Sequence, residues 1–167
     1  MKSMFLAYLL TFLQPTTDTN CCNANVVLSQ TQEAVTVYRD CNRNDSIGFI
    51  MNDTLREDYF VGTIYQIKDG FAKVEGEYAI SQESIPKGWV ELRYISTYLV
   101  MDSQVPIYDN PNTNSGKTFI DFPEWYPVEI LDCFQGWLYV NYRDNKQQKT
   151  GWLPPEFQCA NPYTTCN

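Results

Sequence analysis

The chain has 167 residues, of which 44% are hydrophobic and 15% aromatic, so it carries enough apolar side chains to form packed cores rather than a disordered chain. Its 12 basic and 20 acidic residues give a formal net charge of −8, which repels phosphate backbones and argues against nucleic acid as a partner. It has no histidine, which excludes Ser-His-Asp and Cys-His nucleophilic sites and histidine-ligated zinc.

One pair of acidic residues remains as a catalytic candidate. Asp121 and Glu124 stand close together in the segment IDFPEWYP, and paired carboxylates can act as general acid and base. Acidic side chains are rarely buried, so a solvated loop is the favoured interpretation. We therefore expect no enzymatic activity, no catalytic residue and no cofactor.

Residues 1–24 are predicted to form a signal peptide and an N-terminal segment. One lysine precedes an apolar run at residues 4–13, which is typical of a secretory signal. The run is too short to span a bilayer, which needs about 20 apolar residues. We expect an exported protein, either periplasmic, cell-envelope or secreted, with no membrane insertion once the signal is removed. A buried or frayed N-terminal helix is the alternative.

Beyond that segment the sequence predicts an all-β protein. Short runs rich in Val, Ile, Tyr and Phe alternate with turns rich in Gly, Asn, Asp and Pro, a pattern typical of a sandwich or barrel. In the segment WLYVNY, alternation puts Trp137 and Tyr139 on one face and Leu138 and Val140 on the other. The predicted strands include residues 34–39, 59–67, 71–78, 104–109, 126–131 and 137–142.

A repeated pattern of Gly-aromatic pairs predicts two domains. Gly70-Phe71 and Gly88-Trp89 recur downstream as Gly136-Trp137 and Gly151-Trp152, with matching strands around them. We expect one domain over residues 30–99 and a second, with a C-terminal extension, over residues 100–167. A linker at residues 95–104 is expected between them, and it should be open to proteases.

Six cysteines favour disulfides in an oxidising compartment, in agreement with export. They allow many pairings, and spacing alone does not select one. Cys159 and Cys166 are the first candidates, because they would close a short loop and tie down the C-terminus. The absence of a CxxC pair makes a metal site improbable.

The two repeats together resemble the bacterial Src-homology-3-like (SH3-like) domain. An opening aromatic strand, a variable loop, an aliphatic strand, a first Gly-Trp and a closing Gly-Trp occur twice in this order. The second repeat also resembles the eukaryotic peptide-binding version, because PIYDN is similar to its opening ALYDY and GWLPPEF to its closing segment. The resemblance implies two tandem small SH3-like β-barrels.

The resemblance also implies an aromatic groove in each repeat. In the second repeat the groove residues are Tyr108, Trp137, Pro154 and Phe157, and flat aromatic faces of this kind suit extended peptides or sugar rings. Trp125 and Tyr126, in the loop before a strand, could line the same groove. In the first repeat the matching residues are Tyr38, Phe71 and Tyr94, with Glu91 at the place of Pro154.

Some of these aromatic residues have a structural interpretation as well. Trp89 and Trp152 lie inside closing strands, so a role in the core or at a barrel edge is favoured for them. For Trp137 and Tyr108, groove and core remain open alternatives, because alternation does not show which face is wet.

The leading hypothesis is a non-enzymatic exported binding module for a peptide, a cell-wall muropeptide (peptidoglycan fragment) or a partner protein. The alternative is an acidic protein-protein interaction or inhibitor protein with no small-ligand groove.

Overall fold

The computed structural model describes residues 21–31, 33–161, 163 and 166, and over these residues the protein is all-β, as predicted. Thirteen strands and two short 3-10 helices make up the regular structure of these described residues. Residues 1–20 of the predicted signal lie outside the described residues. None of the helices among the described residues has the length and apolar character needed to cross a membrane.

The strands are short and most are half-buried. Their bounds, with those of the 3-10 helices η1 and η2, are β1 Ala24–Leu28, β2 Val35–Tyr38, β3 Ser46–Ile50, β4 Phe60–Lys68, β5 Phe71–Tyr78, β6 Ser84–Glu91, η1 Leu92–Tyr94, β7 Ile95–Leu99, β8 Gln104–Tyr108, β9 Lys117–Asp121, β10 Val128–Phe134, β11 Trp137–Arg143, β12 Gln148–Leu153, η2 Pro155–Phe157 and β13 Gln158–Cys159.

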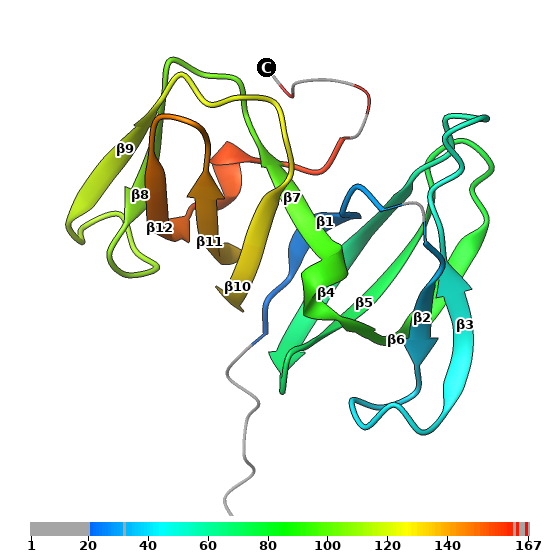
Figure 1. The fold of residues 1–167 in the computed structure, drawn as a ribbon. Coiled ribbons are helices and arrows are strands. Elements are labelled where there is room, and N and C mark those ends of the chain that lie inside the picture. The colour runs from blue at the N-terminus through cyan, green and yellow to red at the C-terminus, as the bar shows by residue number, and fades with distance from the viewer. Residues whose placement is uncertain (1–20, 32, 162, 164–165, 167) are drawn as a thin grey trace, which may run out of the picture.

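The strand order is the same on the two sides of a central pair, β1 and β7. From β1 outward the order is β4, β5, β6, β2 and β3, and from β7 outward it is β10, β11, β12, β8 and β9. Figure 1 shows the two groups of strands on either side of this pair. The first half is therefore β1–β6 and the second half β8–β12. The first half includes β1, which precedes the start at residue 30 expected from the repeat.

All strands join one antiparallel sheet that is open at β3 and β9, which form its ends. The sequence predicts two closed barrels, whereas hydrogen bonds between β1 and β7 run from one half into the other. The strand order explains the difference. Each half lacks a strand that would join its outer end back to its inner end, so the pairing continues across the centre instead.

β7 is shared by the two halves. It pairs with β1 of the first half, with β10 of the second half and with the C-terminal strand β13. All five of its residues are buried. The expectation of an exposed linker at residues 95–104 is therefore wrong for residues 95–99, and only residues 101–103 between β7 and β8 are exposed loop. Apolar residues such as Ile95 and Leu99 make this segment a core strand.

The repeated Gly-aromatic pairs have two structural roles. Gly70 and Gly136 stand in the tight turns before β5 and β11 with φ of +77° and +86°, a conformation that glycine adopts without steric cost. Gly88 and Gly151 instead allow close packing between strands. A Cβ on Gly88 would lie 2.4 Å from Val37, and a Cβ on Gly151 would lie 2.4 Å from Ile107.

One continuous cluster of buried apolar residues extends through both halves. The predicted alternation in β11 is confirmed, since Leu138, Val140 and Tyr142 are buried and the residues between them are partly exposed. A smaller cluster around Val27, Tyr98 and Cys159 lies on the other side of the central strands. The core is therefore continuous through the centre of the molecule.

Two disulfides reinforce this arrangement. Cys159–Cys166 closes the C-terminal loop, as predicted. Cys22–Cys133, which spacing could not select, joins a cysteine two residues before β1 to β10 of the second half. The same segment forms backbone bonds with both halves, because Cys22 donates to Tyr65 and Gln135 donates to Cys21. Covalent and hydrogen bonds thus hold the two halves together where β1 begins.

Limited digestion with proteinase K should cut the native chain at residues 101–103 and leave residues 95–99 intact, because the backbone of β7 is buried and paired. The two fragments should remain linked until a reductant is added, since Cys22 and Cys133 fall on opposite sides of the cut. Mass spectrometry of reduced and unreduced digests checks both points. A preferred cut within residues 95–99 would contradict the central role of β7.

Candidate functional site

A row of aromatic side chains crosses the outer face of the second half. Tyr139 of β11 pairs with Trp152 of β12, and Trp152 pairs with Tyr108 of β8. Directly paired residues project from the same face of a sheet. The rings of Tyr139 and Trp152 lie 5.2 Å apart between centroids. With Trp137, which precedes Tyr139 on the same face, these residues form what we call the aromatic row.

Trp137 stands at one end of the aromatic row and is partly exposed, as are Tyr139 and Trp152. It meets Tyr108 edge to face, with centroids 5.4 Å apart and ring planes at 86°. Tyr108 is only 7% exposed, whereas Trp137 is half-buried. Trp137 therefore provides a partly exposed aromatic surface in contact with the buried ring of Tyr108. Of the two alternatives that the sequence leaves open, core describes Tyr108, whereas Trp137 is intermediate between groove and core.

Pro154 and Phe157 have different positions relative to Trp137. Trp137 precedes Leu138 and Pro154 follows Leu153, and Leu138 and Leu153 are the last pair between β11 and β12, so both residues stand at the same end of these strands. Pro154 is buried and directly precedes η2. Phe157, in η2, is half-buried and packs against the main core. The structure thus brings Tyr108 and Trp137 into contact, buries Pro154 at the end of β12 and packs Phe157 against the core.

A small cavity of about 230 Å³ lies beside the row. It is lined by Trp152 together with Pro111, Asp132 and Phe134 among others. Asp132 of β10 pairs with Tyr139, so its carboxylate lies next to the aromatic row on a fourth strand. A shallow hollow next to flat rings, with a single carboxylate at its side, can receive a small side chain that carries a hydrogen-bond donor.

The first half has the same aromatic pair in nearly the same geometry. Tyr38 and Phe71 meet edge to face with centroids 6.1 Å apart and planes at 84°. Tyr38 pairs with Trp89 as Tyr108 pairs with Trp152. Trp89 is 8% exposed, and the ammonium of Lys73 lies 5.7 Å from its ring centroid. Lys73 occupies the place that Tyr139 has in the second half.

Charged side chains cover the aromatic pair of the first half. The guanidinium of Arg43 lies 5.2 Å from the ring centroid of Phe71 and 3.5 Å from Glu91. Arg93 also pairs with Glu91, at 3.0 Å, and lies over Tyr94. A ligand would have to displace these cation–π contacts and ion pairs before it reached Phe71. Tyr38, Phe71 and Tyr94 therefore form a closed surface.

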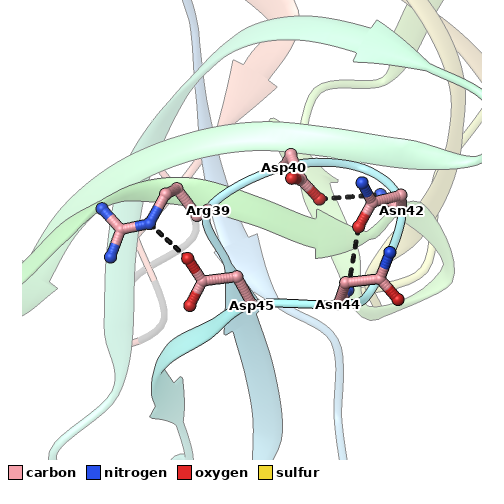
Figure 2. Close-up of polar contacts among 5 residues, drawn as sticks. All are labelled: Arg39, Asp40, Asn42, Asn44 and Asp45. Atoms are coloured by element: carbon pink, nitrogen blue, oxygen red, sulfur yellow. Dashed lines mark hydrogen bonds and ion pairs between the residues drawn. The ribbon is translucent and has the colours of Figure 1, made fainter.

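The loop between β2 and β3 holds Arg43 in this position. Figure 2 shows its polar contacts, in which Asn42 donates its backbone N–H to Asp40 and Asn44 donates to Asn42. Arg39 and Asp45 form an ion pair across the base of the loop. These contacts join residues of the loop to one another, and the side chain of Arg43 reaches Phe71 of β5 from this loop.

The described residues contain no group of three or more His, Cys, Asp or Glu side chains that could hold a metal ion.

Lys117 is the cation that approaches the aromatic row. Its ammonium lies 5.5 Å from the ring centroid of Tyr108 and 5.4 Å from that of Phe119. Among the described residues, no Lys or Arg lies over Trp137, Tyr139 or Trp152. The second half therefore presents the more open of the two aromatic surfaces.

Trp125 and Tyr126 have structural contacts outside the row. Trp125 stacks on Tyr98 of β7, with centroids 4.4 Å apart and planes at 11°. Tyr126 stacks on the buried Tyr142 of β11, with centroids 5.6 Å apart. The structure thus packs both rings against core residues, and does not bring them beside Trp137 as the sequence suggested. Adjacent aromatic residues in a loop do not by themselves show which way each ring turns.

A buried hydroxyl anchors the loop that carries these rings. Tyr142 donates to the carboxylate of Asp144 and accepts from the backbone N–H of Glu124. Burial raises the pKa of Tyr142, so its hydroxyl keeps the proton that it donates. Hydrogen bonds from the backbone of Lys146 and from Tyr142 lower the pKa of Asp144 below its ordinary value. The ionised form of Asp144 is therefore the one that the fold stabilises.

The carboxylate pair considered for catalysis has ordinary surface contacts. Asp121 and Glu124 are both exposed, and Asp121 accepts a hydrogen bond from the side chain of Gln104 at 2.8 Å. These observations favour the solvated-loop interpretation.

Sequence reasoning missed Tyr139 and Trp152 as members of the surface. Alternation already placed Tyr139 on the face of Trp137, but only the register between β11 and β12 shows that Trp152 lies directly beside it.

No protein-family model, no curated protein and no solved structure matches this chain. Its function is therefore inferred from its own side chains.

Asp144→Asn should destabilise the protein most at neutral pH. Folding lowers the pKa of Asp144, so the ionised side chain stabilises the folded protein. This stabilisation is fully present above the unfolded-state pKa of about 4 and is lost as the pH falls through the folded-state pKa. The difference in melting temperature between wild type and variant, measured from pH 7 to pH 3, should shrink as the pH falls below about 4. A constant difference over this range would contradict the hydrogen-bond network.

Proposed function

We propose that the protein is a non-enzymatic, exported binding module that holds an extended peptide on the aromatic row of its second half. The observation that carries the proposal is the row itself, because Tyr139, Trp152 and Tyr108 align across three paired strands and Trp137 adds a partly open ring. The absence of histidine from the sequence supports a binding role over a catalytic one. The two disulfides support export.

Two SH3-like units that share β7 are the fold that we propose for this module. Each unit has an opening strand, a hairpin, a three-stranded meander, a 3-10 turn and a closing strand. In the first unit η1 leads into β7, and in the second unit η2 leads into β13. β7 closes the first unit by pairing with β1 and opens the second by pairing with β10 and β13. The repeated Gly-Trp pairs in the sequence support this assignment.

An extended peptide fits the dimensions and chemistry of the row. Four neighbouring strands, from β10 to β8, span about 14 Å at a spacing of about 4.8 Å per strand. A polyproline II segment rises about 3.1 Å per residue, so four or five peptide residues, roughly, would cross the row. Rigid aromatic rings lose little rotamer entropy on binding. The net charge of −8 and Asp132 beside the row favour neutral or basic peptides over acidic ones.

Trp137→Ala should weaken binding of such a peptide about 30-fold, which corresponds to about 2 kcal/mol and is the range of an aromatic hot spot. The probes are an array of proline-containing decapeptides and a set of purified muropeptides, with affinities measured by calorimetry for those that bind. The variant should remain folded, because the ring of Trp137 is only half-buried.

Trp125→Ala is the matched control. It removes the same side chain from a position that stacks on Tyr98 away from the row, so it should lower the melting temperature and leave peptide affinity unchanged. Two results would count against the proposal. One is an equal loss of peptide affinity in both variants. The other is binding of a folded partner protein with an affinity that Trp137→Ala does not change, and this result would favour the alternative of an acidic interaction or inhibitor protein.

A further inference from the structure

A larger cleft lies on the other half of the molecule, away from the aromatic row. It has a volume of about 940 Å³ and lies between the outer face of β4 and β5 and a wall formed by the described C-terminal residues Gln158, Ala160, Asn161, Tyr163 and Cys166. Its lining shares no residue with the aromatic row or with the small cavity beside it. A ligand in this cleft would therefore use contacts independent of the proposed peptide site.

The floor of the cleft is polar and regular. Asn25 of β1 pairs with Thr63 of β4, and Thr63 pairs with Glu75 of β5, so an amide, a hydroxyl and a carboxylate lie in one row across three strands. In the next row Glu77 of β5 pairs with Ser84 of β6. All of these side chains line the cleft. The backbones of Thr63 and Glu77 are paired with a strand on each side, so at these positions only side chains are available to a ligand.

The opposite wall is held in place by covalent and polar contacts. The Cys159–Cys166 disulfide closes the C-terminal loop. The hydroxyl of Tyr163 donates to the backbone carbonyl of Glu57, and its ring meets Tyr59 at a centroid distance of 5.5 Å. Gln158 donates its side-chain amide to Gly136 at 2.7 Å. The wall is therefore fixed to both halves of the molecule.

Two tyrosines line the cleft, Tyr65 on its floor and Tyr163 on the opposite wall. On the floor, the lining positions 61–65 of β4 extend about 13 Å at about 3.3 Å per residue. Across the strands from β1 to β6, the floor extends about 14 Å at about 4.8 Å per strand. The floor is therefore large enough for a ligand of several linked units.

The charge of the lining restricts the chemistry of that ligand. Among the described residues that line the cleft, Glu75 and Glu77 are charged and none is Lys or Arg. Lys87 at the border is already paired with Glu75 at 3.3 Å and lies over the ring of Tyr65. Phosphate, sulfate and acidic sugar polymers would find no cation to neutralise them in the lining.

A neutral chain of sugars satisfies these constraints. Each sugar hydroxyl can donate to a carboxylate such as Glu77 and accept from an amide or hydroxyl such as Asn25 or Thr63. The apolar face of a sugar ring can pack on Tyr163, which is 45% exposed, whereas Lys87 already lies over the ring of Tyr65. An extended peptide fits less well, because β4 and β5 have no free edge to pair with its backbone. We propose that this cleft binds a linear, neutral oligosaccharide, independently of the aromatic row.

Calorimetry and NMR titration of the full chain with cellotetraose, chitotetraose and maltotetraose test the proposal. At least one of these neutral probes should bind saturably and shift the resonances of Asn25 and Thr63, whereas tetragalacturonate should bind at least tenfold more weakly. Ser84→Trp fills the cleft and should weaken binding at least tenfold. The matched control is Ser46→Trp, which places the same side chain at the exposed start of β3 and should leave affinity unchanged.

Trp137→Ala separates this proposal from the peptide site, since it should leave sugar affinity unchanged. The proposal is overturned if none of the neutral probes binds saturably, or if Ser84→Trp and Ser46→Trp bind them equally well. Tighter binding of tetragalacturonate than of every neutral probe would also overturn it. Preservation of the fold in both variants is checked by their melting temperatures.

Discussion

The structure depends on one strand that belongs to both halves. β7 gives its backbone hydrogen bonds to β1, β10 and β13, and every residue in it is buried. Neither half can complete its pairing without this strand, and small units of this size gain stability mainly by packing together. The Cys22–Cys133 disulfide joins the same two halves, so it adds a covalent constraint across the hydrogen-bonded junction.

The two halves share a strand order but differ in the side chains that reach the surface. In the first half Lys73 and Arg43 lie over aromatic rings, and Glu91 pairs with Arg43. In the second half Tyr139 stands where Lys73 does in the first. Charged side chains therefore cover the aromatic rings of the first half, whereas the rings of the second half are partly exposed. The polar cleft lies on a different surface, at the outer face of β4 and β5 in the first half.

Local features of the fold follow from the sequence, whereas long-range ones do not. Alternation predicts the buried face of β11, and the repeated glycines predict the turns before β5 and β11. The sequence does not predict the role of β7, because residues 95–99 differ little in composition from a short apolar linker. The pairing of β7 with β1 and β10 also joins positions that are far apart in the sequence, which local patterns do not indicate. The sequence also does not predict that Arg43 covers the ring of Phe71. Arg43 reaches this ring from a loop in which Arg43 itself has a φ of +66°, and composition does not indicate such a loop conformation.

The direct test of the shared strand is whether the two halves unfold together. Fluorotryptophan labelling places one probe in the first half, Trp89, and three in the second, Trp125, Trp137 and Trp152, and fluorine NMR follows each during urea unfolding. The account predicts one coincident transition for all four probes, which Leu99→Ala in β7 shifts equally to lower urea. Separate transitions for Trp89 and the other three, with Leu99→Ala affecting only one of them, would contradict it.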